Sequence, residues 1–215
     1  MNNKLLEDIF KAYYDARQNK RSKKSSLEFE IDYEKKLFEL YEDIKKRKYE
    51  PQKSIAFIVN KPVKREIFAA DFRDRVVHHL IFNYINSVFE KHFIKDSYSC
   101  RVGKGTSYGI RRADKFIRSC SENYSKDCWI LKLDIQGYFM SIDKNILYEK
   151  IEVRLRKIKY LEFDINLILY FIRKTIFHNS TKNCIVKGKK KTGSDYQCLK
   201  VYFFRKKIVD FQLVI

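Results

Sequence analysis

The sequence feature that most constrains this fold is a short apolar run that ends on an aspartate. Residues 129–133 are mostly apolar and β-prone, and Asp134 follows them directly. Gly137 then interrupts the pattern, and Asp143 opens a stretch with helical spacing, for which it is the expected cap. The order predicted for this region is therefore strand, turn and helix.

An aspartate at the end of a buried strand has two interpretations. It caps the strand end or a following helix, as aspartates often do, or it places a carboxylate where a divalent cation can bind. Phe139 lies five residues further on, close enough to wall a pocket beside such a cation. The spacing alone leaves both interpretations open.

A second constrained region is a predicted two-stranded hairpin with a basic tip. Residues 55–59 form an apolar run, and residues 65–69 are expected to return as the second strand, with the residues between them forming the turn. Lys61, Lys64 and Arg65 lie at this turn and offer several donors to a triphosphate. A solvated basic turn is the alternative, because a chain this rich in lysine and arginine produces such turns often.

A third segment, residues 96–106, combines glycines with cationic side chains. Gly103 and Gly105 let backbone amides approach a phosphate closely, and Arg101 and Lys104 supply positive charge. A Gly-Lys-Gly sequence taken alone is a weak indication of phosphate binding.

The charge of the chain favours a polyanionic partner. Forty-six Lys and Arg residues against 27 Asp and Glu give a formal net charge of +19, which indicates nucleic acid first and a membrane surface second. The sequence shows no apolar run near the roughly 20 residues that a spanning helix needs, and no signal-peptide pattern. We therefore expect a cytoplasmic chain with no membrane partner. Five cysteines without close pairs predict neither a disulfide framework nor a zinc site.

Helical periodicity accounts for much of the remaining sequence. Residues 2–18 and 27–48 are predicted helices separated by a basic linker, and Ser25 with Glu28 fits a capping box for the second. A helix after Asp71 is expected to bury the stripe Val76, Val77, Leu80, Ile81, Tyr84, Ile85 and Val88. Further helices are predicted at residues 105–123, from Asp143 to about 157, and from about 163 to 176.

These three segments, in this order, resemble those of reverse transcriptases, and most closely the group II intron and diversity-generating retroelement branch of bacterial enzymes. The resemblance covers roughly residues 1–187. It implies an α+β fold with right-hand polymerase-like fingers plus a partial palm, in which helices pack on a small antiparallel sheet. The fingers would span residues 1–125, with N-terminal helices at 1–50, and the partial palm residues 126–187.

The resemblance also implies an activity, that of an RNA-directed DNA polymerase that uses Mg²⁺. Asp134 matches the catalytic aspartate that binds the metal ions, together with the carbonyl oxygen of Ile135. Phe139 matches the aromatic residue that lies under the sugar and excludes a ribose 2′-hydroxyl.

The implied binding residues divide between nucleotide and nucleic acid. Arg65 matches the residue that grips the incoming deoxynucleoside triphosphate, with Lys61 and Lys64 as weaker candidates. The residues expected to lie against nucleic acid are Arg73, Arg75, Arg101, Lys104 and Gly105, although solvated surface is an equal alternative for the first two. The implied partners are an RNA template and an RNA–DNA hybrid, and a possible accessory protein is left unidentified.

The chain departs from the family in one decisive respect. Two cations about 3.5–4 Å apart cannot be held by one aspartate, and the family supplies the other carboxylates from a Tyr-x-Asp-Asp hairpin. The 215 residues contain no Tyr-x-Asp-Asp. We therefore expect a truncated, inactive form of the polymerase, with a non-catalytic nucleic-acid-binding fragment as the alternative.

Residues 188–215 have an explanation in the genetic code. Reading one base earlier, residues 208–215 permit asparagine, cysteine, glycine, phenylalanine, proline, isoleucine, glycine and asparagine, which resembles the family motif expected before the missing hairpin. An adenine run encoding residues 189–191 is a natural place for such a slip. This segment is accordingly predicted to be out of frame.

Overall fold

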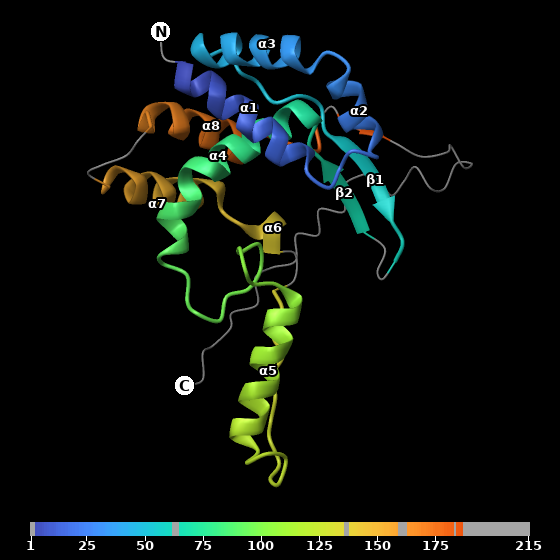
Figure 1. Ribbon diagram of the computed structural model, residues 1–215, viewed down its shortest axis with the longest axis vertical. Helices are drawn as coiled ribbons and strands as arrows, with labels where there is room; N and C mark the ends of the chain where they lie inside the picture. The colour runs from blue at the N-terminus through green and yellow to red at the C-terminus, as the bar shows by residue number, and fades with distance from the viewer. Residues whose placement is uncertain (1–2, 62–64, 136–137, 159–162, 183, 187–215) are drawn as a thin grey trace.

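The computed structural model describes residues 3–61, 65–135, 138–158, 163–182 and 184–186 (Figure 1). It has the mixed α+β composition expected from the sequence. The helices are α1 (Asn3–Arg17), α2 (Lys24–Glu30), α3 (Tyr33–Lys45), α4 (Phe72–Glu90), α5 (Thr106–Cys120), α6 (Tyr138–Ser141), α7 (Lys144–Arg156) and α8 (Ile165–Phe177), and the strands are β1 (Ile55–Val59), β2 (Arg65–Ala69) and β3 (Ile185–Val186).

The core is built around the packing of α1 on α4, with α3 and α8 against them. Of the stripe predicted on α4, Val76, Val77, Leu80 and Ile81 are buried, and the remaining three residues pack partly buried against the core. The same core contains Leu155 of α7 and Phe171 of α8. It therefore takes residues from both sides of position 125, and the domain boundary predicted there stays a prediction.

The single helix predicted for residues 27–48 is wrong, because the chain breaks between α2 and α3. The break lets Phe29 of α2 pack on Phe72 of α4, with ring centroids 5.1 Å apart, while Phe38 of α3 contacts Phe10 of α1 at 6.0 Å. The capping box predicted at Ser25 is also wrong. The N-cap of α2 is Lys23, two residues before Ser25, and it provides no side-chain cap.

The hairpin bounds are confirmed, but the sheet is not purely antiparallel. The strands β1 and β2 pair in antiparallel register from Val59 opposite Arg65 to Ile55 opposite Ala69. The strand β3 adds to the other edge of β1 in parallel orientation, giving the order β2-β1-β3. It arrives after α8, and such a long connection allows a parallel pairing that a tight turn does not.

The strand predicted at residues 129–133 is wrong, since the segment is neither strand nor helix. It follows α5, which projects away from the body of the molecule (Figure 1) and buries none of its residues. No strand in the described ranges pairs with this segment. An extended chain without a neighbour leaves its backbone groups to water and forms no ladder.

Within the described ranges, no helix combines the length and apolar character needed to cross a membrane.

Candidate nucleic-acid interface

The hairpin places the predicted phosphate-binding residues at the entry to β2. Arg65 is the first residue of β2 and pairs with Val59, the last residue of β1. Lys61 lies just before the tip and is exposed. Lys64 lies outside the described residues. The backbone thus brings Lys61 and Arg65 to the same end of the hairpin, as the sequence predicts.

A buried carboxylate anchors the base of this hairpin to α4. Asp74 is 2% exposed and accepts hydrogen bonds from the Tyr49 hydroxyl at 2.9 Å and the Gln52 backbone amide at 2.8 Å. Burial is the largest influence on the Asp74 carboxyl and raises its pKa, while the two hydrogen bonds oppose that shift. Burial and the neighbouring carboxylate also raise the pKa of Tyr49. These contacts fix the segment that leads into β1.

The role of Asp74 was not predicted from the sequence, although the sequence contains a signal for it. Asp74, Val77 and Ile81 recur at helical spacing on the buried face of α4. A carboxylate on an apolar face needs buried hydrogen-bond donors, because burying it unpaired is costly.

Arg73 and Arg75 lie in the first turn of α4, as predicted, but each has a partner within the protein. The Arg73 guanidinium contacts the Asp43 carboxylate at 2.6 Å and lies 5.2 Å from the centroid of the Tyr49 ring. Arg75 Nε donates to the Ala70 carbonyl at 3.0 Å. Arg73 therefore connects the start of α4 to α3, and Arg75 stabilises the junction of β2 and α4. Their contact with a template stays a prediction.

The glycine-containing loop is held by its own cations. Arg101, with a side chain 9% exposed, donates to the carbonyls of Ile94 at 2.8 Å and Ser97 at 3.0 Å, and to the Glu90 carboxylate at 2.8 Å. Lys104 Nζ donates to the Lys95 carbonyl. Arg101 and Lys104, which were predicted to bind phosphate, therefore form hydrogen bonds that stabilise the conformation of the loop.

The two glycines of this loop need the freedom that the sequence predicts for them. Gly103 has φ 71° and Gly105 has φ 135°, conformations that other residues rarely adopt. Gly105 is the N-cap residue of α5. Nothing lies within 4 Å of the position that a Cβ would occupy at either glycine, so the space beside this backbone is open.

A bidentate ion pair joins the loop to α5. Arg112 contacts both carboxylate oxygens of Asp96, at 2.6 and 3.0 Å, and the Tyr98 hydroxyl donates to the same carboxylate at 2.7 Å. Arg112 is the largest cause that lowers the pKa of Asp96, to about 2. The loop and the first turns of α5 are thereby held as one unit.

The projecting helix α5 carries cations beside aromatic rings. Lys104 and Arg111 lie 5.8 and 6.0 Å from the centroid of the Tyr108 ring, and Arg112 lies 4.5 Å from that of Phe116. Aromatic faces beside positive charge suit the stacking of unpaired bases and the neutralisation of their phosphates. Tyr108 was not among the residues predicted from the sequence, although Arg111 lies three positions from it on the predicted helix. The proximity of Lys104, which precedes the helix, depends on the course of the chain at Gly105.

The two residues predicted to bind the metal ions are exposed. Asp134 and Ile135 lie in the irregular segment before α6, both with exposed side chains. Phe139 lies in the short helix α6. Asp143, by contrast, caps α7 as predicted, accepting from the amides of Asn145 at 2.8 Å and Ile146 at 3.2 Å.

The described residues do not fit a magnesium site of the two-ion type. Among them, no group of three or more His, Cys, Asp or Glu side chains is placed to hold a metal ion. Asp134 and one carbonyl oxygen supply fewer ligands than Mg²⁺ sites of that type require. We therefore derive no catalytic step through a metal from this arrangement.

Comparison of the chain with known protein families and with curated protein sequences finds no match.

Proposed function

We propose that this chain is the fingers region and the beginning of the palm of an RNA-directed DNA polymerase of the reverse-transcriptase type, and that its described residues bind RNA or an RNA–DNA hybrid. The observation that carries the proposal is the hairpin register. In this register the second strand of the hairpin begins at Arg65. In the reverse transcriptases that the sequence resembles, the arginine at this position binds the incoming nucleotide.

Charge and backbone geometry support the binding part of the proposal. An excess of cations neutralises nucleic-acid phosphates and releases their counterions, which supplies affinity without sequence selectivity. Lys61 and Arg65 would hold the triphosphate of a deoxynucleotide, and the open backbone at Gly103 and Gly105 would lie against the nucleic-acid strand. Phe139 would lie under the sugar.

We propose further that the 215 residues do not catalyse polymerisation on their own. Asp134 is one carboxylate, and phosphoryl transfer of this type needs several carboxylates to hold its cations. Those partners would come from a Tyr-x-Asp-Asp hairpin, which these residues do not contain.

The second candidate is a nucleic-acid-binding protein without catalysis. It is favoured by the intramolecular pairing of Arg73, Arg101 and Arg112, which gives those side chains a structural role independent of any polymerase. The two candidates differ in the DNA that lies downstream of the codons for these 215 residues. Read in the earlier frame, that downstream DNA encodes a Tyr-x-Asp-Asp only if the first proposal holds.

Primer extension tests the first proposal. The 215-residue chain should not extend an oligo-dT primer on a poly-adenylate RNA template with Mg²⁺. A chain continued in the earlier frame should do so, and Asp134→Asn should abolish extension while leaving template binding intact. Asp127→Asn, which removes an exposed carboxylate from the same segment, is the matched control. Equal extension by the Asp134→Asn chain would refute the catalytic assignment.

A further inference from the structure

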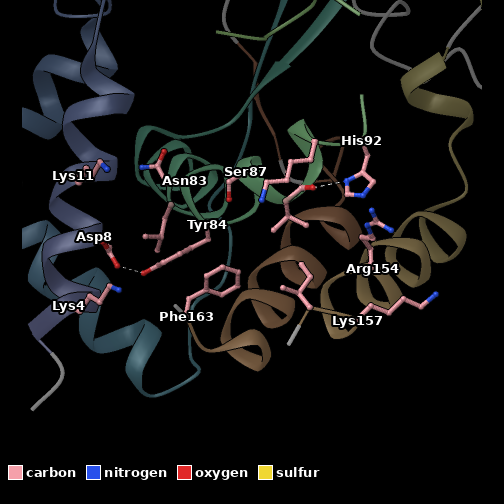
Figure 2. Close-up of a pocket in the computed structure, with 14 residues that line it drawn as sticks. Lys4, Asp8, Lys11, Asn83, Tyr84, Ser87, His92, Arg154, Lys157 and Phe163 are labelled. Atoms are coloured by element: carbon pink, nitrogen blue, oxygen red, sulfur yellow. Dashed lines mark hydrogen bonds between the residues drawn. The ribbon is translucent and has the colours of Figure 1, made fainter. Parts of the chain in front are cut away.

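A pocket of about 640 Å³ lies at the far end of α4 from the hairpin (Figure 2). The helix α4 begins just after β2 and ends at this pocket, whose walls come from α1, α4, α7 and the segment before α8. Its volume lies in the range of roughly 300–1,000 Å³ that is usual for small-molecule sites.

The floor of the pocket is apolar and aromatic. Tyr84 and Phe163 lie with ring centroids 4.9 Å apart, beside Val88 and Ile158. The Tyr84 hydroxyl donates to Asp8, the single carboxylate among the described lining residues, and so this charge is already engaged. A planar ring entering the pocket would meet an aromatic surface whose polar group is satisfied.

The rim of the pocket is cationic on two sides. Figure 2 shows Lys4 and Lys11 of α1 on one side and Arg154 and Lys157 on the other, with Ser87 between them. Lys91 also lines the pocket. Five cations thus surround a floor that has one carboxylate.

Two cations at the C-terminal end of α7 have no carboxylate partner within the part of the chain that the structure describes. Their neighbour Arg156 pairs with Glu152 at 2.7 Å, whereas Arg154 and Lys157 have no acidic partner among the described residues. They lie three positions apart, so their charges repel on adjacent turns of the chain. A bound phosphate would relieve this repulsion.

A second pocket on the same molecule shows that the high content of lysine and arginine in the chain does not make every pocket cationic. It measures about 470 Å³ and is lined by Lys24, Leu27 and Ile31 together with Ser22, Glu28 and Glu30, so its acidic side chains outnumber the cation. The pocket at the end of α4 is therefore selectively cationic.

We propose that this pocket binds one phosphorylated nucleoside unit, with the base on the ring of Tyr84 or Phe163 and the phosphate on Arg154 and Lys157. Stacking on an aromatic face beside cations is the general mode by which proteins hold unpaired nucleotides. The unit is either a free nucleotide or part of a single-stranded RNA. The pocket is separate from the hairpin tip and extends the proposed function to a second contact site.

Two titrations of the 215-residue chain test the proposal and distinguish the two sources. Adenosine triphosphate is titrated by calorimetry, and a fluorescein-labelled 12-nucleotide single-stranded RNA by anisotropy. The Arg154→Gln/Lys157→Gln double variant should weaken the binding of one of them by about tenfold, because it removes charge-assisted contacts to phosphate. If the double variant binds adenosine triphosphate more weakly, the natural ligand is a free nucleotide. If it binds only the RNA more weakly, the ligand is part of a single strand.

Three further variants make the outcome decisive. Ser87→Leu keeps every charge but places a branched apolar side chain between the two cationic sides of the pocket, and it should weaken the same ligand by about tenfold if the base enters. Lys35→Gln on α3 removes an exposed charge that does not line the pocket, and it should change the affinity by less than about twofold. Arg65→Ala tests the hairpin separately, because Arg65 does not line the pocket. If this variant binds RNA as the wild type does, the role proposed for the hairpin is wrong, and the result for the pocket is unaffected. Unchanged binding of both ligands by the double variant and by Ser87→Leu, with both folded by circular dichroism, would overturn the proposal.

Discussion

The face of α4 that packs on α1 and the segment that leads to Asp134 are both strongly apolar, yet only the first is buried. Val76 and Leu80 are 0% and 1% exposed, whereas Trp129 and Leu133 are 95% and 80% exposed. The difference lies in the neighbours. The helix α4 satisfies its backbone internally and needs only another helix to cover its stripe, and α1 provides that surface.

A strand depends on its neighbours for hydrogen bonds as well as for burial. The strand β1 forms because its partner β2 follows after a short turn. Residues 129–133 have the composition of a strand, but no strand among the described residues pairs with them. An apolar pattern therefore predicts a helix more safely than it predicts a strand with a distant partner.

The largest difference between these two regions is expected from a matched pair of leucine substitutions. Leu80→Ala should lower the free energy of unfolding by about 2–5 kcal/mol, because it removes a buried side chain and leaves a cavity. Leu131→Ala should change it by less than about 0.5 kcal/mol, as surface substitutions usually do. Urea unfolding followed by circular dichroism measures both. A comparable loss for Leu131→Ala would show that the segment is packed.

The buried carboxylate at the base of the hairpin gives the next effect. Tyr49→Phe should destabilise the protein by about 1–3 kcal/mol, because Asp74 loses a buried donor at 2.9 Å. Tyr41→Phe is the control, since that ring lies at the edge of the core and no hydrogen bond of its hydroxyl is described. Equal stabilities in urea would show that the Tyr49–Asp74 bond does not anchor the hairpin.

The same carboxylate should leave a signature in the pH dependence. Its pKa is raised in the folded state, so the native protein binds a proton that the unfolded chain releases. The contribution of this group to stability is therefore largest below its unfolded pKa, near 3.8, and falls as pH rises through the folded value. The difference in unfolding free energy between the wild type and Asp74→Asn should shift in favour of the wild type on acidification from pH 7 to 4. A difference that does not vary with pH would contradict the assignment.

Substitutions of two exposed aspartates should have smaller effects on stability. Asp143→Ala should cost about 1 kcal/mol through loss of the cap of α7. Asp134→Ala should change stability by less than about 0.5 kcal/mol, because the residue is exposed. Thermal unfolding of the two variants compares them directly. A large loss for Asp134→Ala would indicate a structural role for the candidate catalytic residue.

The smallest effect is local to the loop before α5. Arg112 and Tyr98 hold the pKa of Asp96 at about 2, so their stabilisation of the loop is present above pH 4 and is lost as pH falls through the folded pKa. Backbone amides of residues 97–104 should exchange faster with deuterium at pH 2 than an intrinsic-rate correction predicts. Asp96→Asn should remove this acceleration, and a wild-type loop that stays equally protected would contradict the role of the ion pair.

Local patterns in the sequence predicted what local chemistry decides. The bounds of β1 and β2, the stripe on α4 and the cap at Asp143 each depend on residues close together in the chain. The division between α2 and α3 was not predicted, because it depends on aromatic contacts with α1 and α4.

The candidate site was predictable only in part, for the same reason. Charge predicted Arg101 and Lys104 as cations near phosphate, but their bonds to Glu90 and Lys95 depend on the course of the loop. The pocket at the end of α4 gathers side chains from four parts of the chain and has no local signature. The out-of-frame segment predicted at residues 188–215 lies outside the described residues.

We propose that the excess positive charge of this chain acts on nucleic-acid phosphates through the hairpin and the glycine-containing loop. The affinity for a single-stranded RNA, measured across a series of salt concentrations, tests this proposal. Binding should be tight at low salt, and the logarithm of the affinity should fall with the logarithm of salt by roughly 0.7 per phosphate contact. Arg65→Ala should reduce that slope by about one contact. An affinity that does not change with salt would show that the positive charge does not act on phosphates.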